Sequence, residues 1–89
     1  MAPYRVTFLP SAVRELAALR RGPRRQIAQQ IEALMEGPRP SEVRVLPGGE
    51  GLLRLRVEEY RIIYRVDDLD RAVLVVKIGR RRPIKRRGE

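Results

Sequence analysis

Apolar and basic side chains alternate between positions 52 and 66, and this alternation is the clearest structural signal in the sequence. Leu53, Leu55 and Val57 alternate with arginine, and a second alternating run begins after Glu58-Glu59. A period of two places successive residues on opposite faces of a β-strand. The two glutamates leave room for a tight antiparallel turn, although the sequence lacks the Asn-Gly or Asp-Gly pair that favours one. We therefore predict a hairpin with one apolar and one basic face. The basic face carries Arg54, Arg56 and Arg61.

The N-terminal half predicts one strand followed by two helices. Residues 4–9 alternate as a strand does and stop at Pro10. Ser11 is placed to cap a first helix, because its hydroxyl accepts a hydrogen bond from a free backbone N–H group. Gly22 is placed to end that helix and Pro23 to begin a second one. Apolar residues recur every three or four positions and give each helix one buried stripe. The stripes consist of Ala12, Val13, Leu16, Ala17 and Leu19, and of Ile27, Ile31, Leu34 and Met35.

The C-terminal half predicts the rest of a sheet. Residues 42–46 form a short alternating strand, and the glycine-rich loop 47–51 lacks both the Gly-Lys-Ser/Thr sequence and the following helix of a phosphate-binding loop. Residues 67–70 form a turn. Residues 72–78 are almost continuously apolar, which is typical of a central strand covered on both faces. The order β-α-α-β-β-β-β predicts an α+β fold, with an N-terminal helical hairpin packed on a mainly antiparallel sheet of four or five strands.

Length and missing residue types limit the chemistry of this chain. Its 89 residues predict a single domain over residues 1–89, with a basic tail at 80–89. The sequence has no cysteine and no histidine, so we expect no disulfide, no thiolate chemistry, no metal site and no cofactor. No apolar run approaches the roughly 20 residues that span a membrane, and the first residues lack a signal-peptide core. We therefore expect a cytoplasmic protein without membrane contact.

The charge of the chain indicates what it binds. The formal net charge is +9, and every basic residue except Lys77 and Lys85 is an arginine. A guanidinium group presents a planar set of donors that matches phosphate oxygens. Such a chain attracts nucleic acid in a salt-dependent way, and an acidic protein that masks the charge is the alternative partner. The basic face is therefore either an anion-binding surface or a strongly charged solvated face.

The segment LPGGEGLLRLRVEEYRIIYRVDD, followed by a strand that ends in VVKIGRRR, resembles the RelE/ParE toxin superfamily of bacterial toxin–antitoxin modules. The resemblance covers most of the chain, includes the two N-terminal helices and implies the RelE-like fold. It favours the RelE-like branch, whose members cleave messenger RNA in the ribosomal A site. It thereby implies a metal-independent endoribonuclease, or mRNA interferase, that inhibits translation. The implied partners are a cognate antitoxin, the ribosome and mRNA.

The resemblance also assigns roles to particular residues. The basic pair of the family's third strand corresponds to Arg54 and Arg56, and the arginine of its YR-x-x-Y strand corresponds to Arg61. The arginine after the last strand corresponds to Arg81, and Lys85 stands where many RelE-like toxins have a tyrosine near the substrate base. These five residues are the predicted catalytic set. The arginines would neutralise a five-coordinate phosphate, but arginine is a poor base because its pKa exceeds about 12. General electrostatic attraction to RNA or to an acidic antitoxin is predicted for Arg80, Arg82, Arg86 and Arg87, and Arg80 is the alternative register for Arg81.

Alternatives remain open for the residue that transfers the proton and for the molecule that the toxin acts on. Lys85 is one candidate for proton transfer, because neighbouring cations lower the pKa of an ammonium group. The other candidates are Glu58, Glu59, Tyr60 and Tyr64. The ParE-like branch inhibits DNA gyrase by binding it; the departure from tyrosine at Lys85 favours that branch, and the basic face argues against it. A third hypothesis is a catalytically weak or non-toxic member that binds RNA or the ribosome. In the purely structural alternative, Arg61 forms an ion pair with a glutamate of the hairpin turn.

Overall fold

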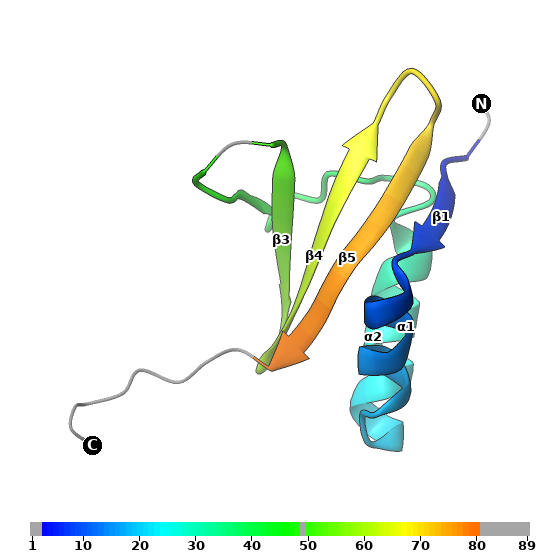
Figure 1. The fold of residues 1–89 in the computed structure, drawn as a ribbon, viewed down its shortest axis with the longest axis vertical. Coiled ribbons are helices and arrows are strands. Elements are labelled where there is room, and N and C mark those ends of the chain that lie inside the picture. Colours follow the sequence, from blue (N-terminus) through cyan, green and yellow to red (C-terminus); the bar gives the residue numbers. More distant parts are fainter. Residues whose placement is uncertain (1–2, 49, 81–89) are drawn as a thin grey trace.

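The computed structural model describes residues 3–48 and 50–80 and has the α+β architecture that the sequence predicts. Five strands form one sheet in the order β1-β5-β4-β3-β2. Figure 1 labels β1, β5, β4 and β3. Every neighbouring pair is antiparallel except β1 and β5, which are parallel. The elements are β1 (Arg5–Phe8), α1 (Pro10–Ala17), α2 (Arg21–Ala33), β2 (Arg44–Val45), β3 (Leu52–Val57), β4 (Tyr60–Asp67) and β5 (Ala72–Arg80).

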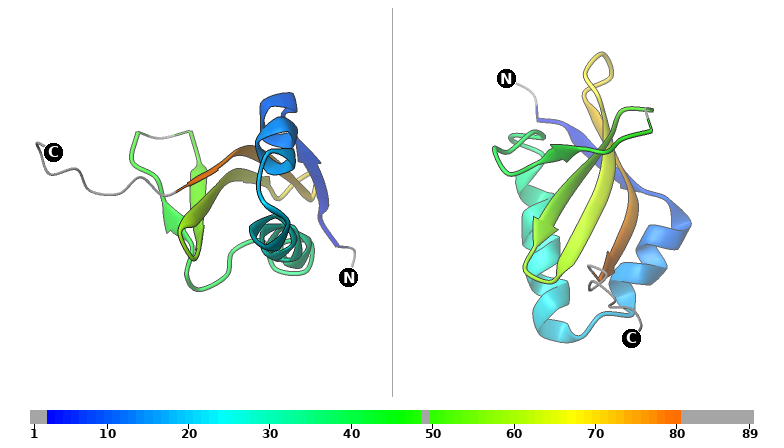
Figure 2. Two further views of the ribbon diagram at one scale, coloured as in Figure 1. Left: turned by 90° about the horizontal axis from the view of Figure 1, so that it is seen from below. Right: turned by 90° about the vertical axis from the view of Figure 1, so that its left-hand side faces the viewer.

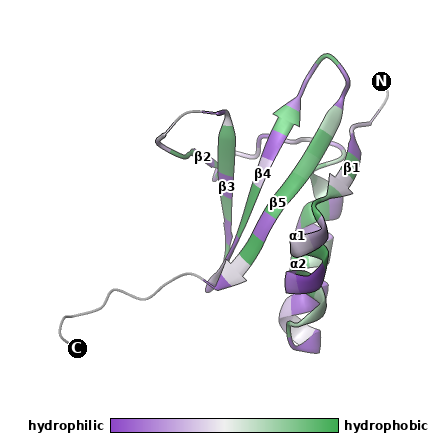
Figure 3. Ribbon diagram, in the orientation of Figure 1, coloured by the Kyte–Doolittle hydropathy of each residue, from purple (hydrophilic) through white to green (hydrophobic). Residues whose placement is uncertain are grey.

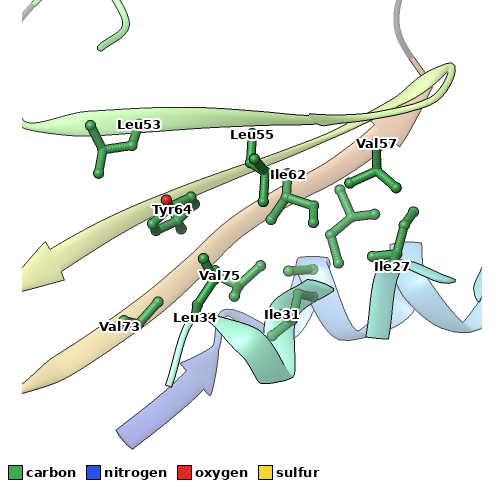
Figure 4. Close-up of a cluster of buried hydrophobic side chains, with 12 residues drawn as sticks. Ile27, Ile31, Leu34, Leu53, Leu55, Val57, Ile62, Tyr64, Val73 and Val75 are labelled. Atoms are coloured by element: carbon green, nitrogen blue, oxygen red, sulfur yellow. The ribbon is translucent and has the colours of Figure 1, made fainter. Parts of the chain in front are cut away.

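Both helices lie on the same side of the sheet, as the right-hand view of Figure 2 shows. The core fills the space between helices and sheet, and α2 contributes Ile27, Ile31 and Leu34 to it (Figure 4). Helix α1 contributes the fully buried Ala12, with other apolar residues packed at the margin. The strands contribute the alternate residues that face the helices, namely Leu53, Leu55, Val57, Ile62, Tyr64, Val73, Val75 and Ile78.

The helix boundaries differ from those that the sequence predicts. Leu9 is the N-cap of α1 and Pro10 its first residue, and no side chain caps this end, so the prediction that Ser11 caps the helix is wrong. Proline suits this position because its φ is already helical and it lacks an N–H group that would need a partner. Helix α1 ends at Ala17, and α2 begins at Arg21, so Gly22-Pro23 lies inside the first turn of α2. Proline is tolerated there because the first-turn N–H groups have no intrahelical acceptor.

Helix α1 also covers an open edge of the sheet. Strand β1 pairs only with residues 72–75 of β5, so the rest of β5 has no partner strand on that side. Glu15 of α1 takes the place of that strand, because its Oε1 accepts a hydrogen bond from the backbone N–H of Ile78 at 2.8 Å. The Nζ atom of Lys77 lies 3.6 Å from Oε2 of the same carboxylate. A helix that occupies an edge in this way prevents pairing with another chain.

Strand β5 contains a β-bulge that the sequence pattern conceals. The register with β4 shifts between Ile63, which faces Lys77, and Tyr64, which faces Val75, so Val76 has no partner. An extra residue reverses the alternation of side chains beyond it. The apolar run 72–78 was predicted to be covered on both faces, and that prediction is wrong, since both helices cover one face only. The bulge explains only the adjacent apolar residues Val75 and Val76, because Leu74 precedes it and pairs with Arg65 on the face away from the helices.

Tyr64 anchors the loop that follows α2 to the middle of the sheet. Its side chain is fully buried, and its hydroxyl donates a hydrogen bond to the backbone carbonyl of Pro38 at 2.6 Å. Burial raises the pKa of this phenol from 10.0 to about 12. The neutral phenol is the form that the folded protein stabilises, because a phenolate would lose its hydration and face a carbonyl oxygen.

Replacement of Tyr64 by Phe should make the protein less sensitive to alkali. At neutral pH we expect Tyr64→Phe to lower the free energy of unfolding by roughly 1–3 kcal/mol, because a buried carbonyl loses its donor. The pKa of Tyr64 is higher in the folded state, so its stabilising contribution is full below pH 10 and is lost as pH rises through about 12. Urea unfolding from neutral to alkaline pH should therefore show a steeper loss for the wild type. Parallel pH profiles for both proteins would contradict this account.

Candidate nucleic-acid interface

The face of the sheet that points away from the helices carries a group of arginines on three adjacent strands. We call this surface the arginine face. In the register of the sheet, Arg44 of β2 lies opposite Arg54 of β3, and Arg56 of β3 lies opposite Arg61 of β4. Arg65 lies further along β4, opposite Leu52. The hydrophilic bands along β3 and β4 in Figure 3 correspond to this alternation.

Cations that lie directly opposite one another destabilise an antiparallel pair unless something neutralises them. Within the described part of the chain, neither Arg54 nor Arg61 forms an ion pair. Arg65 has only a long contact, with Nη2 4.0 Å from Oε1 of Glu50. Arg54 and Arg61 therefore hold positive charges on the arginine face without an ion pair to a described carboxylate, which is a property expected of an anion-binding surface.

The turn glutamates do not neutralise Arg61. Glu58 accepts a hydrogen bond from Nε2 of Gln26 at 3.2 Å, and Glu59 pairs with Nη2 of Arg80 at 2.9 Å. The structure thus shows neither ion pair of the structural alternative for Arg61. Its Nε atom is buried and has no hydrogen-bond partner among the described residues. A buried donor without a partner is costly, and a bound anion would supply the missing acceptor.

A shallow pocket of about 450 Å³ lies beside the edge of the arginine face. Its described lining residues are Glu42, Arg44, Arg54 and Arg56. Glu42 is exposed and makes no ion pair within the described residues, although three guanidinium groups share its pocket. The prediction from sequence did not include Glu42. The signal was present in the alternation of residues 42–46, which puts Glu42 and Arg44 on one side, but the pairing of Arg44 with Arg54 was needed to connect them to the site.

The structure brings together three of the residues predicted from sequence and separates a fourth. Arg54, Arg56 and Arg61 share the arginine face. Arg80 lies opposite Tyr60, on the side of the helices, and lines a different pocket of about 530 Å³ near the turn between α1 and α2. The structure therefore does not bring Arg80 to the arginine face. The remaining predicted residues, Arg81, Arg82, Lys85, Arg86 and Arg87, lie outside the described residues.

None of the four other candidates for proton transfer lies on the arginine face. Tyr64 is buried on the side of the helices, and Tyr60 lies on that side as well. Glu58 and Glu59 form the hairpin turn, with their carboxylates already bonded to Gln26 and Arg80. Glu42 is the carboxylate that the described residues place beside the paired arginines.

A small, cation-rich α+β domain with this strand order is typical of the RelE/ParE class of bacterial toxins, and the comparisons agree. The chain belongs to the ParE toxin family of type II toxin–antitoxin systems, whose family model matches residues 6–84, and so to the RelE/ParE superfamily. It is accordingly a toxin of a type II toxin–antitoxin module. No curated protein matches the sequence.

Solved structures of RelE proteins have the same fold. The chain is 29% identical to a chain of the archaeal RelE–RelB complex from Pyrococcus horikoshii, with a TM-score of 0.81 over 92% of this chain and 99% of that one. It is 27% identical to a chain of the RelBE2 toxin–antitoxin complex from Mycobacterium tuberculosis, with a TM-score of 0.78 over 91% and 94%. The isolated RelE toxin of E. coli, at 24% identity and a TM-score of 0.80 over 92% and 88%, shows likeness of fold.

The described helices include none that is long and apolar enough to cross a membrane.

Removal of one member of an opposed arginine pair should stabilise the protein. We expect Arg54→Gln to raise the free energy of unfolding by roughly 0.2–1 kcal/mol at low salt, because it relieves the repulsion from Arg44. The gain should shrink at high salt, where surface charges are screened. The matched control is Arg5→Gln, because Arg5 is an exposed strand residue that lies opposite Ala72. Urea unfolding at two salt concentrations measures the effect, and an equal gain from both substitutions would refute the repulsion.

Proposed function

We propose that this toxin is a metal-independent endoribonuclease that cuts mRNA on the ribosome. The observation that carries the proposal is the arginine face, where guanidinium groups on adjacent strands lie side by side without carboxylate partners for Arg54 and Arg61. The resemblance to RelE-like toxins also supports a ribosome-dependent nuclease. Such an arrangement is costly for the fold, and binding of a polyanion offsets that cost.

The reaction that suits these residues is attack by a ribose 2′-hydroxyl on the adjacent phosphate. The 2′-oxygen loses its proton and forms a new bond to phosphorus, the bond from phosphorus to the 5′-oxygen breaks, and the 5′-oxygen takes up a proton. The products are a 2′,3′-cyclic phosphate and a 5′-hydroxyl end. Arg54, Arg56 and Arg61 would stabilise the additional negative charge of the five-coordinate phosphate, and their fixed positions on strands spare reorganisation during the reaction.

The proposed proton acceptor is Glu42. A carboxylate is a suitable general base when it lies near the hydroxyl that it deprotonates, and Glu42 shares a pocket with three of the arginines. Two predicted residues outside the described part of the chain complete the proposal. Arg81 would add a further contact to the phosphate. Lys85 would donate the proton that the leaving 5′-oxygen takes up. Orientation of the mRNA by the ribosome would contribute as well, since positioning alone can offset roughly 7–11 kcal/mol of a barrier.

The proposed partners follow from charge and from the relatives. Two of the similar solved chains were determined as toxin–antitoxin complexes. A cognate antitoxin with an acidic toxin-binding segment would match the net charge of +9 and would block RNA by covering the arginine face or by remodelling the basic tail. The ribosome and mRNA are cytoplasmic, so the proposed reaction takes place in the cytoplasm.

Inhibition of DNA gyrase is the second candidate function. It is favoured by the family model, which describes ParE toxins, and by Lys85 in the place of the tyrosine of many RelE-like toxins. A gyrase inhibitor would act by binding alone and would induce the SOS response while translation continued. Induced expression with mapping of the 5′ ends of cellular RNA separates the functions: cuts within translated reading frames support the nuclease. Growth without arrest would indicate the non-toxic RNA-binding alternative.

Loss of the phosphate-binding arginines should abolish toxicity. We expect Arg61→Ala to lower cleavage on ribosomes by about 10²- to 10³-fold, as loss of one preorganised donor does in other enzymes. The double substitution of Arg61 and Arg81 by Ala should eliminate growth arrest. Arg5→Ala is the control, since it removes an equal charge from β1, which β5 separates from the strand that carries Arg61. A double variant that still arrests growth fully would show that the site is wrongly assigned.

Loss of the Glu42 carboxylate should separate catalysis from binding. We expect Glu42→Gln to lower the single-turnover cleavage rate by about 10²- to 10⁴-fold, the usual effect of a general base. Binding of single-stranded RNA should persist or tighten, because the substitution removes a negative charge beside three arginines. Glu36→Gln is the control, as Glu36 is an exposed carboxylate beyond the end of α2. Unchanged cleavage in Glu42→Gln would exclude Glu42 as the base.

A further inference from the structure

Gly79 occupies an unusual place in the sheet. It lies near the end of β5 and pairs with Arg61 of β4, which in turn pairs with Arg56 of β3. The bulge at Val76 is what places Gly79 on the arginine face, since it turns Ile78 toward the helices. Glycine within a strand is unfavourable, because it has no side chain to pack and loses much conformational freedom on folding. The presence of a glycine opposite Arg61 in the middle of a sheet therefore calls for a structural or functional explanation.

The fold supplies no such reason within the described residues. The backbone of Gly79 does not have a positive φ, in contrast to Gly48 at +103° and Gly51 at +69°. A Cβ atom built at Gly79 meets no described heavy atom within 4 Å, apart from those of its chain neighbours. An alanine or a valine is therefore compatible with this part of the sheet, and the second is the better strand former.

The space over Gly79 adjoins the group that lacks an acceptor. Arg61 lies directly across from Gly79, and the buried Nε of Arg61 has no hydrogen-bond partner among the described residues. Lys77 lies two residues before Gly79 on the same face, but its Nζ atom is 3.6 Å from Oε2 of Glu15, which compensates its charge. A ligand that enters this space meets the positive charge of Arg61 on β4, and no described side chain lies between it and the backbone of Gly79.

We infer that the open space over Gly79 admits the sugar–phosphate backbone of the RNA at the position of cleavage. This inference rests on the proposed function and adds a steric requirement to it. Arg61 binds the phosphate only when the ribose beside it can approach β5, and a side chain at position 79 holds the RNA away. Gly79 is thus a position that determines access of the substrate, and it is not required for folding.

The test compares Gly79→Ala and Gly79→Val with the wild type in ribosome-bound mRNA cleavage and in thermal unfolding. We expect both variants to have a Tm equal to or above that of the wild type. Cleavage should fall in Gly79→Ala and should fall by about 100-fold or more in Gly79→Val, because displacement of the reacting groups by about 1 Å has an effect of that size. Gly22→Ala is the matched control, since Gly22 also lacks a positive φ and has no described heavy atom near a built Cβ. Its cleavage should not change.

The outcomes distinguish this inference from the function on which it rests. If the wild type does not cut ribosome-bound mRNA, the proposed nuclease function fails and the inference falls with it. If the wild type cuts and Gly79→Val cuts at a similar rate, only the inference is overturned. A lower Tm for Gly79→Ala also overturns it, because the glycine would then be required by the fold. Full Tm with lost cleavage in the Gly79 variants, and unchanged cleavage in Gly22→Ala, supports it.

Discussion

Both helices pack on the same face of the sheet, and the position of every functional side chain depends on this one-sided packing. Ile27, Ile31 and Leu34 of α2 meet the apolar residues of the strands on that side. Since side chains alternate along a strand, burial of one set forces the other set onto the opposite face. A shift of the register by one residue would bury guanidinium groups, so formation of the core and presentation of the arginines are a single event.

The carboxylates and the arginines of the molecule have different roles. Carboxylates at the periphery make definite structural contacts. Asp68 accepts hydrogen bonds from the hydroxyl of Tyr4 at 2.7 Å and from Arg39 at 3.1 and 3.0 Å, and the Arg39 guanidinium holds the pKa of Asp68 below its usual value. Glu15 fills the open edge of β5. On the outer face, Arg54 and Arg61 form no ion pair with a described carboxylate, and the sheet holds them in place through its backbone hydrogen bonds and its core.

The bulge in β5 decides which groups reach the arginine face. If Val76 paired regularly with β4 and formed no bulge, the alternation that buries Val73 and Val75 would direct Gly79 toward the helices and Arg80 away from them. With the bulge, Arg80 lies on the side of the helices and pairs with Glu59, while Lys77 and Gly79 lie beside β4 on the outer face. One unpaired residue thus changes the composition of the candidate site, as bulges often do next to functional groups.

The pattern of apolar and basic residues predicts the strands, the helices and the basic face. The alternation over residues 52–66 is strong enough to predict the hairpin and to group Arg54, Arg56 and Arg61, because strand periodicity and the need to bury apolar residues act locally. The sequence also indicates the family, through motifs in that segment and at the end of the last strand. Local signals failed at Ser11 and at Gly22-Pro23, where the fixed φ of proline and the free N–H groups of a first helical turn allow more than one boundary.

Which residues from separate strands meet depends on how the whole chain packs. The pairing of Arg44 with Arg54, the place of Glu42 beside them, and the position of Gly79 across from Arg61 depend on strand order and on a bulge. Neither feature has a signature in the sequence, since the apolar run that contains the bulge looks the same as an uninterrupted central strand. Contacts between distant segments are set by how the whole core packs, and no short stretch of residues contains that information.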